Sequence, residues 1–260
     1  MEPKASDCQT FAEPERRQPW GSVSKNICVS DWDGTLRPGF MIVDWIGYLS
    51  NALGLTKSHE HNLAALVNLY VKKQVSYNEF ATTAVTIYAE ALCGQSAQDV
   101  DKIADLFVQR DFRRLFPFSA ELLRLVKRRR YGVFILSGAP LIPILAYAKL
   151  IPIDFVYAVD VLRNERDTFT DKLATNYALK DNKQHAITQL QSEGFEITLA
   201  FGDTESDRPL LEVAKHPFFV LQSQAQGNAI GFPTVTPATI LSSVNQIIGG
   251  ETIFNGRNFE

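Results

Sequence analysis

Short apolar segments that alternate with helical patterns constrain the fold of this chain more than any other feature. Four of them are only four or five residues long and lack the polar alternation of a half-buried strand: 27–30, 133–136, 197–201 and 218–221. Such runs are typical of strands buried on both faces of a parallel sheet. Helical periodicity precedes three of them, at 120–130, 183–190 and 208–214. The alternation predicts an α/β fold with crossover helices, and a more polar fifth run at 155–161 is expected toward an edge.

Residues 41–115 interrupt the alternation, because they contain no convincing strand. Apolar residues recur there at helical spacing, first in the series Leu63, Leu66, Val67, Tyr70 and Val71. Ser76 and Glu79 fit a capping box at the start of a second helix. We therefore expect an α-helical domain inserted into an α/β core. The expected segments are a disordered N-terminal tail 1–24, a core 25–40 and 116–248, a helical insertion 41–115 and a C-terminal tail 249–260.

The composition excludes several classes of protein. Lys and Arg number 26 and Asp and Glu number 29, and a net charge of −3 gives no general attraction to nucleic acid or anionic membranes. Three cysteines without CxxC spacing favour neither a disulfide framework nor a zinc site. No secretory signal and no apolar run of about 20 residues is visible. We therefore expect a cytoplasmic protein, monomeric or homodimeric, with no nucleic-acid or membrane partner.

The most informative motif, DWDGT, follows the first predicted strand and places Asp31 and Asp33 two residues apart. Ligands of open α/β sheets bind beyond the carboxyl ends of the strands, so the position alone makes a candidate site. Gly34 permits an immediate turn that would bring the two carboxylates together, where they need a shared proton or a cation. An ordinary Asp/Gly turn is the alternative. An EF-hand calcium loop is excluded, because Leu36 and Ile42 occupy the positions that require Gly and Glu.

Three further polar features follow predicted strands or open the next helix. Ser137 and Gly138 can offer a hydroxyl and backbone N–H groups to a phosphate. Lys183 opens a helix, and Asp203 and Asp207 lie in the acidic segment GDTESD after the next strand. Each of these features alone is weak evidence for a site. Together with the DWDGT motif they are four features, and their occurrence in this order by chance is improbable. They predict one polar site at the carboxyl edge of the sheet.

The order DxDGT, Ser-Gly, Lys and GDxxSD resembles the four motifs of phosphatases of the haloacid dehalogenase (HAD) superfamily. The helical insertion between the first two motifs resembles the C1 cap of the phosphoserine-phosphatase-like branch. The resemblance spans about residues 26–225, and it is specific for the superfamily but not for a substrate. It implies a Rossmann-like core with a parallel sheet flanked by helices, plus an inserted α-helical cap.

The resemblance also implies catalytic roles. Asp31 is the nucleophile that forms an aspartyl-phosphate. Asp33 is first the acid toward the leaving oxygen and then the base toward water. Thr35 supports the loop by hydrogen bonding, and Ser206 is a secondary candidate.

Phosphate and metal ligands follow from the same resemblance. Ser137 and the Gly138 amide hold phosphate oxygens, while Lys183 balances the negative charge. Asp203 is a metal ligand, and Asp207 orients Lys183 or a metal-bound water. Oxygen ligands without His or Cys favour Mg²⁺. The expected metal set is Asp31, Asp33 through its backbone carbonyl, Asp203 and Asp207.

The insertion departs from phosphoserine phosphatases at Phe40. Those enzymes carry a glutamate at the corresponding position that binds the substrate ammonium, and because an aromatic side chain cannot form this ion pair, phosphoserine is disfavoured as a substrate. Phe40, Trp45 and Tyr48 either line an apolar cap pocket or pack the interior of the cap. Three arginines lie at the end of the insertion, and one of them either contacts a second anionic group of the substrate, or they form salt bridges or lie in solvent: Arg110, Arg113 and Arg114.

These features together predict an Mg²⁺-dependent phosphatase that hydrolyses a phosphate monoester of a small metabolite. A phosphotransferase or mutase that uses the same aspartyl-phosphate is an alternative that only product analysis separates. A non-catalytic, receiver-like phospho-binding module is disfavoured, because receivers are much shorter, lack a helical insertion and give Asp33 no role.

Overall fold

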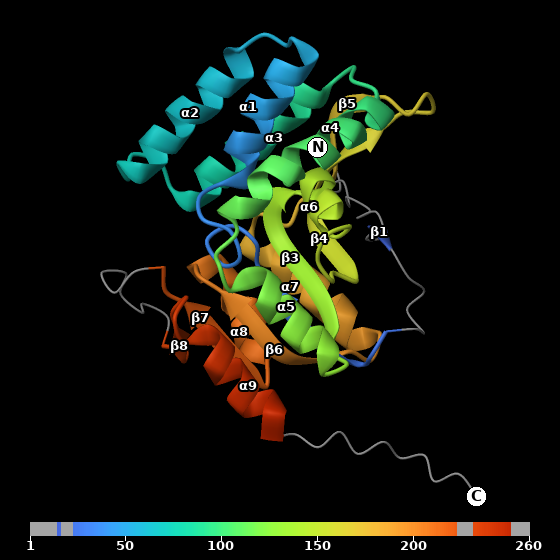
Figure 1. Ribbon diagram of the computed structural model, residues 1–260. Coiled ribbons are helices and arrows are strands. Elements are labelled where there is room, and N and C mark those ends of the chain that lie inside the picture. Colours follow the sequence, from blue (N-terminus) through green and yellow to red (C-terminus); the bar gives the residue numbers. More distant parts are fainter. Residues whose placement is uncertain (1–14, 17–22, 223–230, 251–260) are drawn as a thin grey trace, which may run out of the picture.

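The computed structural model describes residues 15–16, 23–222 and 231–250. A largely parallel sheet forms its core, in the order β1-β4-β3-β2-β6-β7-β8 (Figure 1). The strands along this order are β1 Glu15–Arg16, β4 Phe155–Arg163, β3 Gly132–Pro140, β2 Asn26–Ser30, β6 Glu196–Gly202, β7 His216–Val220 and β8 Thr234–Val235. Only β1 is antiparallel to its neighbour in this order. The predicted α/β fold with a parallel sheet flanked by helices is confirmed.

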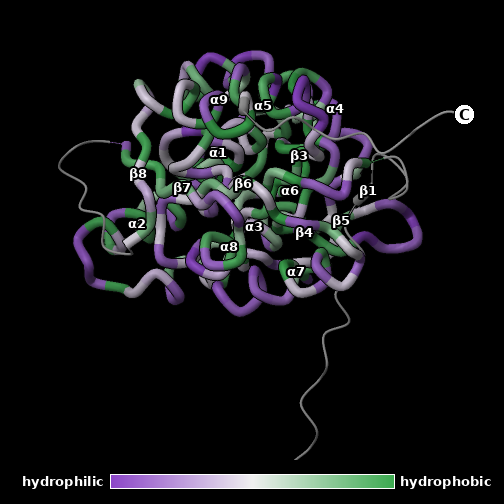
Figure 2. Tube along the Cα trace, turned by 90° about the horizontal axis from the view of Figure 1, so that it is seen from below, coloured by the Kyte–Doolittle hydropathy of each residue, from purple (hydrophilic) through white to green (hydrophobic). Residues whose placement is uncertain are grey.

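Helices cover both faces of the sheet. One buried cluster joins α5 Ser119–Arg128 and α9 Ile240–Gly250, and a second joins α7 Lys180–Ser192 and α8 Arg208–Val213. In β2, Cys28 belongs to the first cluster, whereas the residues on either side of it, Ile27 and Val29, belong to the second. This burial on both faces explains why β2 is a continuous apolar run. Figure 2 shows hydrophobic segments gathered toward the middle of the molecule and hydrophilic loops at its rim.

Helices also fill the segment that the sequence predicts as a helical insertion, above the sheet in Figure 1. They are α1 Met41–Leu53, α2 Ser58–Val71, α3 Tyr77–Leu92 and α4 Ala97–Asp111. We call residues 41–111 the cap. The predicted capping box of α3 is confirmed, because the Glu79 N–H donates to Ser76 Oγ at 3.2 Å and the Ser76 N–H donates to the Glu79 carboxylate at 2.8 Å. A short 3-10 helix, Phe112–Arg114, returns the chain to the core.

One strand, β5 Phe169–Thr175, is absent from the sequence prediction. β4 continues past residue 161 and pairs with β5 as an antiparallel hairpin. Most side chains of β5 are polar or half-exposed, so apolar periodicity gives no signal for it. The hairpin reaches the cap, where the Gly94 N–H donates to the Phe169 carbonyl at 2.9 Å and the Phe169 N–H donates to the Gln95 carbonyl at 3.0 Å. The hairpin of β4 and β5 therefore contacts the cap through backbone hydrogen bonds.

Both predicted tails lie mostly outside the described residues. Within 1–24, Glu15–Arg16 pair with β4 and Val23 is buried. Within 249–260, only the end of α9 is described. Among the described residues, no helix is long and apolar enough to cross a membrane.

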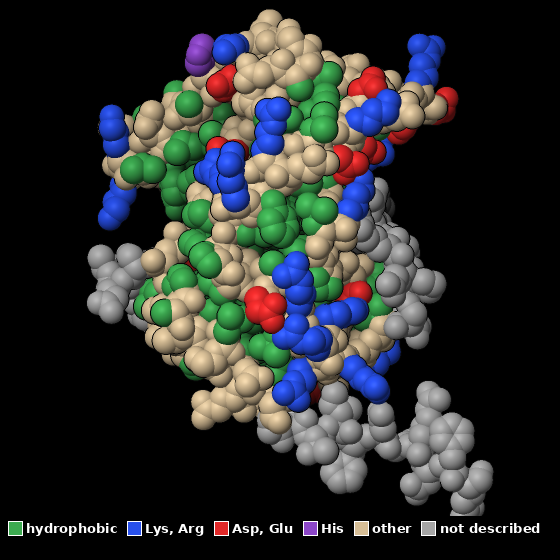
Figure 3. All heavy atoms as spheres, viewed as in Figure 1, with side chains coloured by type: hydrophobic (Ala, Val, Ile, Leu, Met, Phe, Trp, Pro, Cys, Tyr) green, Lys and Arg blue, Asp and Glu red, His purple; other side chains and the backbone are tan. Residues whose placement is uncertain are grey.

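Basic side chains gather on the surface over α5, as Figure 3 shows. Two of them form ion pairs. Lys127 Nζ lies 2.6 Å from the Asp154 carboxylate, and Arg128 Nη2 lies 2.7 Å from Glu121 Oε1. Lys127 and Arg128, at the end of α5, are therefore both engaged in surface ion pairs with other residues of the core domain.

A buried ion-pair network joins the two connections between core and cap. Arg37 is fully buried just before α1, and its Nε and Nη2 atoms each donate at 2.7 Å to the carboxylate of Asp111 at the end of α4. The Tyr147 hydroxyl of α6 Leu141–Tyr147 also donates to Asp111, at 2.7 Å. Asp44 contacts both Arg37 and Arg114, at 2.7 and 2.8 Å. The network fixes the two chain crossings relative to one another.

Asp111→Ala is expected to destabilise the protein by about 3 kcal/mol, because it removes two hydrogen bonds of the buried Arg37 guanidinium and leaves Asp44 as its one carboxylate partner among the described residues. The matched control is Asp105→Ala in the same helix, whose carboxylate pairs with Lys149 and is 43% exposed. Loss of that exposed pair should cost less than about 1 kcal/mol. Urea unfolding measures both free energies. Equal losses for the two variants would contradict the structural role given to the buried network.

Candidate active site

The DWDGT motif begins where the central strand β2 ends. The Asp31 N–H donates to the Phe201 carbonyl of β6 at 2.9 Å, so Asp31 continues the strand register at the carboxyl edge of the sheet. Gly34 has φ +80° and closes the turn by donating to the Arg37 carbonyl at 2.7 Å. A Cβ atom on Gly34 would overlap the Asp203 carboxylate. Glycine is therefore required at this position, both for the backbone conformation and for the close approach of Asp203.

The predicted polar residues converge at this edge. Lys183 is 1% exposed in the first turn of α7, and its Nζ lies 3.2 Å from Asp31 Oδ1 and 2.5 Å from Asp207 Oδ1. The Thr35 hydroxyl donates to Asp203 Oδ1 at 3.1 Å. One carboxylate oxygen from each of Asp31, Asp203 and Asp207 lies within 4.8 Å of the others. Residues from three separate motifs thus surround one carboxylate, that of Asp31.

Asp207 is surrounded by hydrogen-bond donors. Its Oδ1 accepts from Lys183, while its Oδ2 accepts from the Thr204 N–H at 3.0 Å, the Thr204 hydroxyl at 2.9 Å and the Asp203 N–H at 3.2 Å. A carboxylate with both oxygens engaged in this way has little capacity left for a cation. Of its two expected roles, this geometry supports the orientation of Lys183 rather than direct metal ligation. Ser206 shares a 2.8 Å hydrogen bond with the Thr204 hydroxyl.

Asp33 lies beside the cluster and outside it. Its Oδ2 accepts from the Met41 N–H at 2.9 Å, whereas its buried Oδ1 has no hydrogen-bond partner among the described residues. Burial raises the pKa of Asp33 to about 8, although the Arg37 charge partly offsets this. A carboxyl group that holds its proton near neutral pH can donate it to a leaving group.

Burial and like charge act on the other carboxylates as well. Burial raises the pKa of Asp31 to about 6, against the opposing charge of Lys183. Burial, together with the charges of Asp207 and Asp31, raises the pKa of Asp203 well above its ordinary value. One lysine does not neutralise three carboxylates, so the cluster favours a bound proton or cation. Because the donors are all oxygens, the residues present fit a hard divalent ion such as Mg²⁺.

The phosphate-binding candidates lie at the carboxyl end of β3. The buried Ser137 side chain hydrogen-bonds to Asp31, which lowers the pKa of that carboxylate, and its Oγ accepts from the Ala139 N–H at 3.1 Å. A Cβ atom on Gly138 would lie 2.8 Å from the Ala178 Cα. Glycine therefore lets β3 approach the segment before α7 closely.

A cavity of about 320 Å³ lies between core and cap. Its core wall includes Asp31, Asp33, Ser137, Gly138, Lys183 and Asp203. The opposite wall, which we call the cap wall, consists of Phe40, directly before α1, and seven residues of the cap: Ile42, Tyr70, Tyr77, Phe80, Ala81, Ala84 and Val85. The predicted phosphate site therefore lies in a cavity whose wall includes residues of both the core and the cap.

The three aromatic residues for which the sequence allows either a pocket or a packing role divide between the two. Phe40 lines the cavity, but Trp45 and Tyr48 pack against Phe107 inside the cap, with ring centroids 5.3 and 5.4 Å apart. For these two residues the packing alternative is correct.

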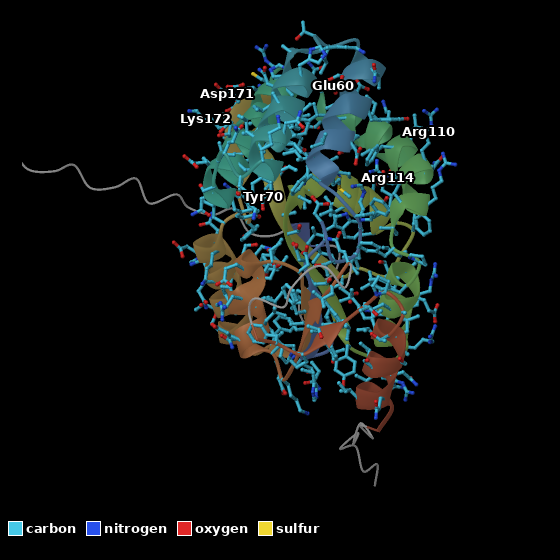
Figure 4. The ribbon with its side chains drawn as sticks, turned by 90° about the vertical axis from the view of Figure 1, so that its left-hand side faces the viewer. Glu60, Tyr70, Arg110, Arg114, Asp171 and Lys172 are labelled. Carbon is cyan, nitrogen blue, oxygen red and sulfur yellow. The ribbon has the colours of Figure 1, made fainter. Side chains whose placement is uncertain are left out.

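The arginines at the end of the insertion do not line the cavity. Arg110 lies over the Tyr48 ring, 5.5 Å from its centroid, and Arg114 pairs with Asp44. Figure 4 shows both arginines on the α4 side of the cap, away from Tyr70. The salt-bridge alternative is therefore correct for Arg114, and neither of these two arginines lines the cavity.

Gln222 was missed. Its Nε2 donates to the Gly34 carbonyl at 2.9 Å and lies 3.4 Å from Asp203 Oδ2. It follows β7 almost directly, so the same strand-end rule that found the acidic motifs would have found it.

The sheet order, the carboxylate cluster at its carboxyl edge and the inserted helices define a capped α/β protein with a polar site between core and cap. Residues 28–212 match the haloacid dehalogenase-like hydrolases, and the chain belongs to that family. The expected membership of the HAD superfamily is confirmed. No significant match was found among curated proteins.

Solved structures share the whole architecture at low sequence identity. A protein of unknown function from Bordetella pertussis Tohama I is 16% identical, with a TM-score of 0.69 over 82% of this chain and 98% of that one. A phosphoserine phosphatase with a phospho-aspartyl intermediate analogue is 16% identical, with a TM-score of 0.57 over 84% and 97%. Cytosolic 5'-nucleotidase IIIB bound to cytidine is 15% identical, with a TM-score of 0.59 over 85% and 86%. At these identities the likeness establishes the fold.

Proposed function

We propose that this protein is an Mg²⁺-dependent phosphatase that hydrolyses a small phosphate monoester through an aspartyl-phosphate on Asp31. One observation carries the proposal: Lys183 Nζ lies 3.2 Å from Asp31 and 2.5 Å from Asp207, in the same cavity wall as Asp203 and as Ser137 and Gly138 of β3. Membership of a hydrolase family agrees with it. The phosphoserine phosphatase of similar fold that holds a phospho-aspartyl intermediate analogue supports the same type of intermediate.

In the first step, a carboxylate oxygen of Asp31 attacks phosphorus, and the bond between phosphorus and the leaving oxygen breaks. The Lys183 ammonium offsets the charge on the nucleophile and the phosphoryl oxygens. Ser137 and the Gly138 N–H bind those oxygens from the cavity wall. Asp33 gives its proton to the leaving oxygen, and its unpartnered Oδ1 in the cavity wall supports this role.

In the second step, water attacks the phosphorus of the aspartyl-phosphate. Asp33, now a carboxylate, accepts the proton of this water. The bond between phosphorus and Asp31 breaks, which releases inorganic phosphate and restores the Asp31 carboxylate. Asp33 ends the cycle protonated, as it began. The hydrogen bond from the Met41 N–H fixes its carboxyl group at the start of α1 throughout.

The metal ion would be held by the carboxylates of Asp31 and Asp203, with the backbone carbonyl of Asp33. Asp203 is positioned for this by Thr35, and Gly34 leaves room for its carboxylate. When bound, Mg²⁺ offsets the negative charge of the nucleophile and the phosphoryl group, so that the two can approach. Asp207 acts indirectly in this proposal, because it accepts a hydrogen bond from Lys183 and holds the ammonium group in position.

The division of the chain into core and cap belongs to the same proposal. The core comprises 25–40 and 116–248 and supplies the reacting groups, while residues 41–115 cover them and exclude bulk water. A cavity of about 320 Å³ favours a small substrate over a protein or a nucleic-acid duplex.

Phosphate release measured with and without Mg²⁺ tests the proposal. Excess EDTA is expected to lower the rate at least about 100-fold, and added Mg²⁺ should restore it. Mg²⁺ should also raise the melting temperature of the protein, because it relieves the repulsion among the buried carboxylates. Hydrolysis that is unaffected by EDTA would refute the metal assignment. Absence of phosphate release from every small phosphate ester in a broad panel would refute the phosphatase itself.

A further inference from the structure

The cavity has a charged half and an uncharged half. Every charged side chain in its wall belongs to the core: Asp31, Asp33, Lys183 and Asp203. The cap wall carries only aliphatic and aromatic side chains, and most of them are at least nine-tenths buried. A phosphate bound beside Asp31 and Lys183 would therefore direct its leaving group toward an apolar surface.

Aromatic rings dominate the part of the cap wall that comes from α2, α3 and the start of α1. The Phe80 ring stacks on Tyr70 with centroids 4.7 Å apart and tilts against Phe40 at 4.8 Å. Tyr77 extends this group, and its hydroxyl donates to the Ala178 carbonyl at 3.2 Å, so the core already satisfies that polar atom. The rings form a fixed surface suited to another flat or apolar group.

The acidic groups of the cap near this region are engaged or distant. Asp44 pairs with Arg37 and Arg114 in the network between the two chain crossings. Figure 4 shows Tyr70 where the cap meets the core, whereas Glu60 of the same helix lies at the far end of the cap. A charged leaving group would lose its hydration in the cavity and gain no counter-charge from the cap wall.

We propose that the substrate carries an uncharged, apolar leaving group of about the size of one aromatic ring, bound against the surface that Phe40, Tyr70 and Phe80 form. This specificity rests on the proposed phosphatase activity and narrows it. The volume of about 320 Å³ has room for a phosphate and one ring. Leaving groups with a carboxylate or an ammonium, such as that of phosphoserine, are excluded by the cost of desolvating them without a partner.

Three phosphate esters with matched leaving oxygens test this specificity: benzyl phosphate, 4-carboxybenzyl phosphate and 4-(aminomethyl)benzyl phosphate. The kcat/KM of benzyl phosphate should exceed those of the anionic and the cationic analogue at least about 100-fold. Using both signs of charge separates desolvation from simple repulsion by the acidic core. Values within about threefold of one another would overturn the inference, as would a preference for either charged analogue.

Acetyl phosphate separates this inference from the proposed function, because its small leaving group does not reach the rings. If acetyl phosphate is hydrolysed while the three benzyl esters react equally, the specificity is wrong and the phosphatase stands. If neither these four compounds nor any ester of the broad panel releases phosphate, the phosphatase is refuted and the inference falls with it.

A variant with a charge in the cap wall gives a second test. Phe40→Lys should shift the ratio of the two kcat/KM values toward 4-carboxybenzyl phosphate by at least about tenfold, since it supplies the missing counter-charge. The half-buried position of Phe40 lets a lysine side chain reach both the cavity and solvent. The control Leu69→Lys lies on α2 beside Tyr70 but is 41% exposed and outside the cavity, and it should leave the ratio unchanged. Equal ratios in the two variants would contradict the proposed contact.

Discussion

Asp31→Asn is expected to lower the rate of phosphate release by about 10⁴-fold or more, because the amide cannot attack phosphorus. Asparagine has nearly the same size as aspartate, and Lys183 keeps its contact with Asp207. Initial rates with benzyl phosphate in Mg²⁺ measure the loss. A variant that retains more than about a tenth of the activity would show that Asp31 is not the nucleophile.

The same substitution should leave the melting temperature unchanged or raise it. Asp31 is one of three buried carboxylates, and burial together with the charges of Asp207 and Asp31 raises the pKa of Asp203. Removing one charge relieves the repulsion among them, which is the usual relation between an active-site charge and stability. The matched control, Asp105→Asn, changes an exposed aspartate on α4 and should alter neither activity nor melting temperature. A large drop in the melting temperature of Asp31→Asn would attribute its inactivity to unfolding.

Asp33→Asn is expected to act differently on different substrates. Asparagine can still accept from the Met41 N–H, so the loop should keep its shape, but it has no acidic proton for the leaving oxygen. For benzyl phosphate, whose alkoxide is a poor leaving group, kcat/KM should fall about 10²- to 10⁴-fold. For 4-nitrophenyl phosphate, whose leaving group departs without a proton, the fall should be less than about tenfold.

The comparison between the two esters is what identifies Asp33 as the acid. A purely structural role would reduce kcat/KM for both esters equally, because both need the same phosphate site. The parameter kcat/KM is the right one, since it reports the first step, in which the leaving oxygen departs. Equal losses for the two esters would refute the proton-transfer role.

The site residues whose convergence is predictable from the sequence lie at or just after the carboxyl ends of strands. Asp31, Ser137 and Asp203 meet because the carboxyl ends of parallel strands share one edge of a sheet, which makes their meeting predictable without coordinates. Lys183 is found by the same logic, at the start of the helix that crosses to the next strand.

Contacts between side chains far apart in sequence were beyond the sequence patterns. Arg37 and Asp111 are 74 positions apart, and neither lies in a motif. Three of the four hydrogen bonds to Asp207 come from Asp203 and Thr204 in the tight turn after β6, and no periodicity reveals such a turn. Strand β5 could not be predicted, because most of its side chains are polar or half-exposed and give no apolar alternation.

The cap shows where residue type alone leaves two outcomes open. Phe40, Trp45 and Tyr48 are all aromatic and close in sequence, yet only Phe40 lines the cavity. The other two lie on the part of α1 that packs against Phe107 of α4. The distinction depends on how the helices pack, and helical spacing does not determine that packing.

Reductive trapping of the intermediate tests the central claim most directly. Protein mixed with benzyl phosphate and Mg²⁺ is quenched with borohydride, which reduces an aspartyl-phosphate to homoserine, and its peptides are read by mass spectrometry. The account predicts homoserine at position 31, dependent on substrate and absent from Asp31→Asn. Substrate turnover with homoserine at another aspartate, or with no reduced residue at all, would contradict it.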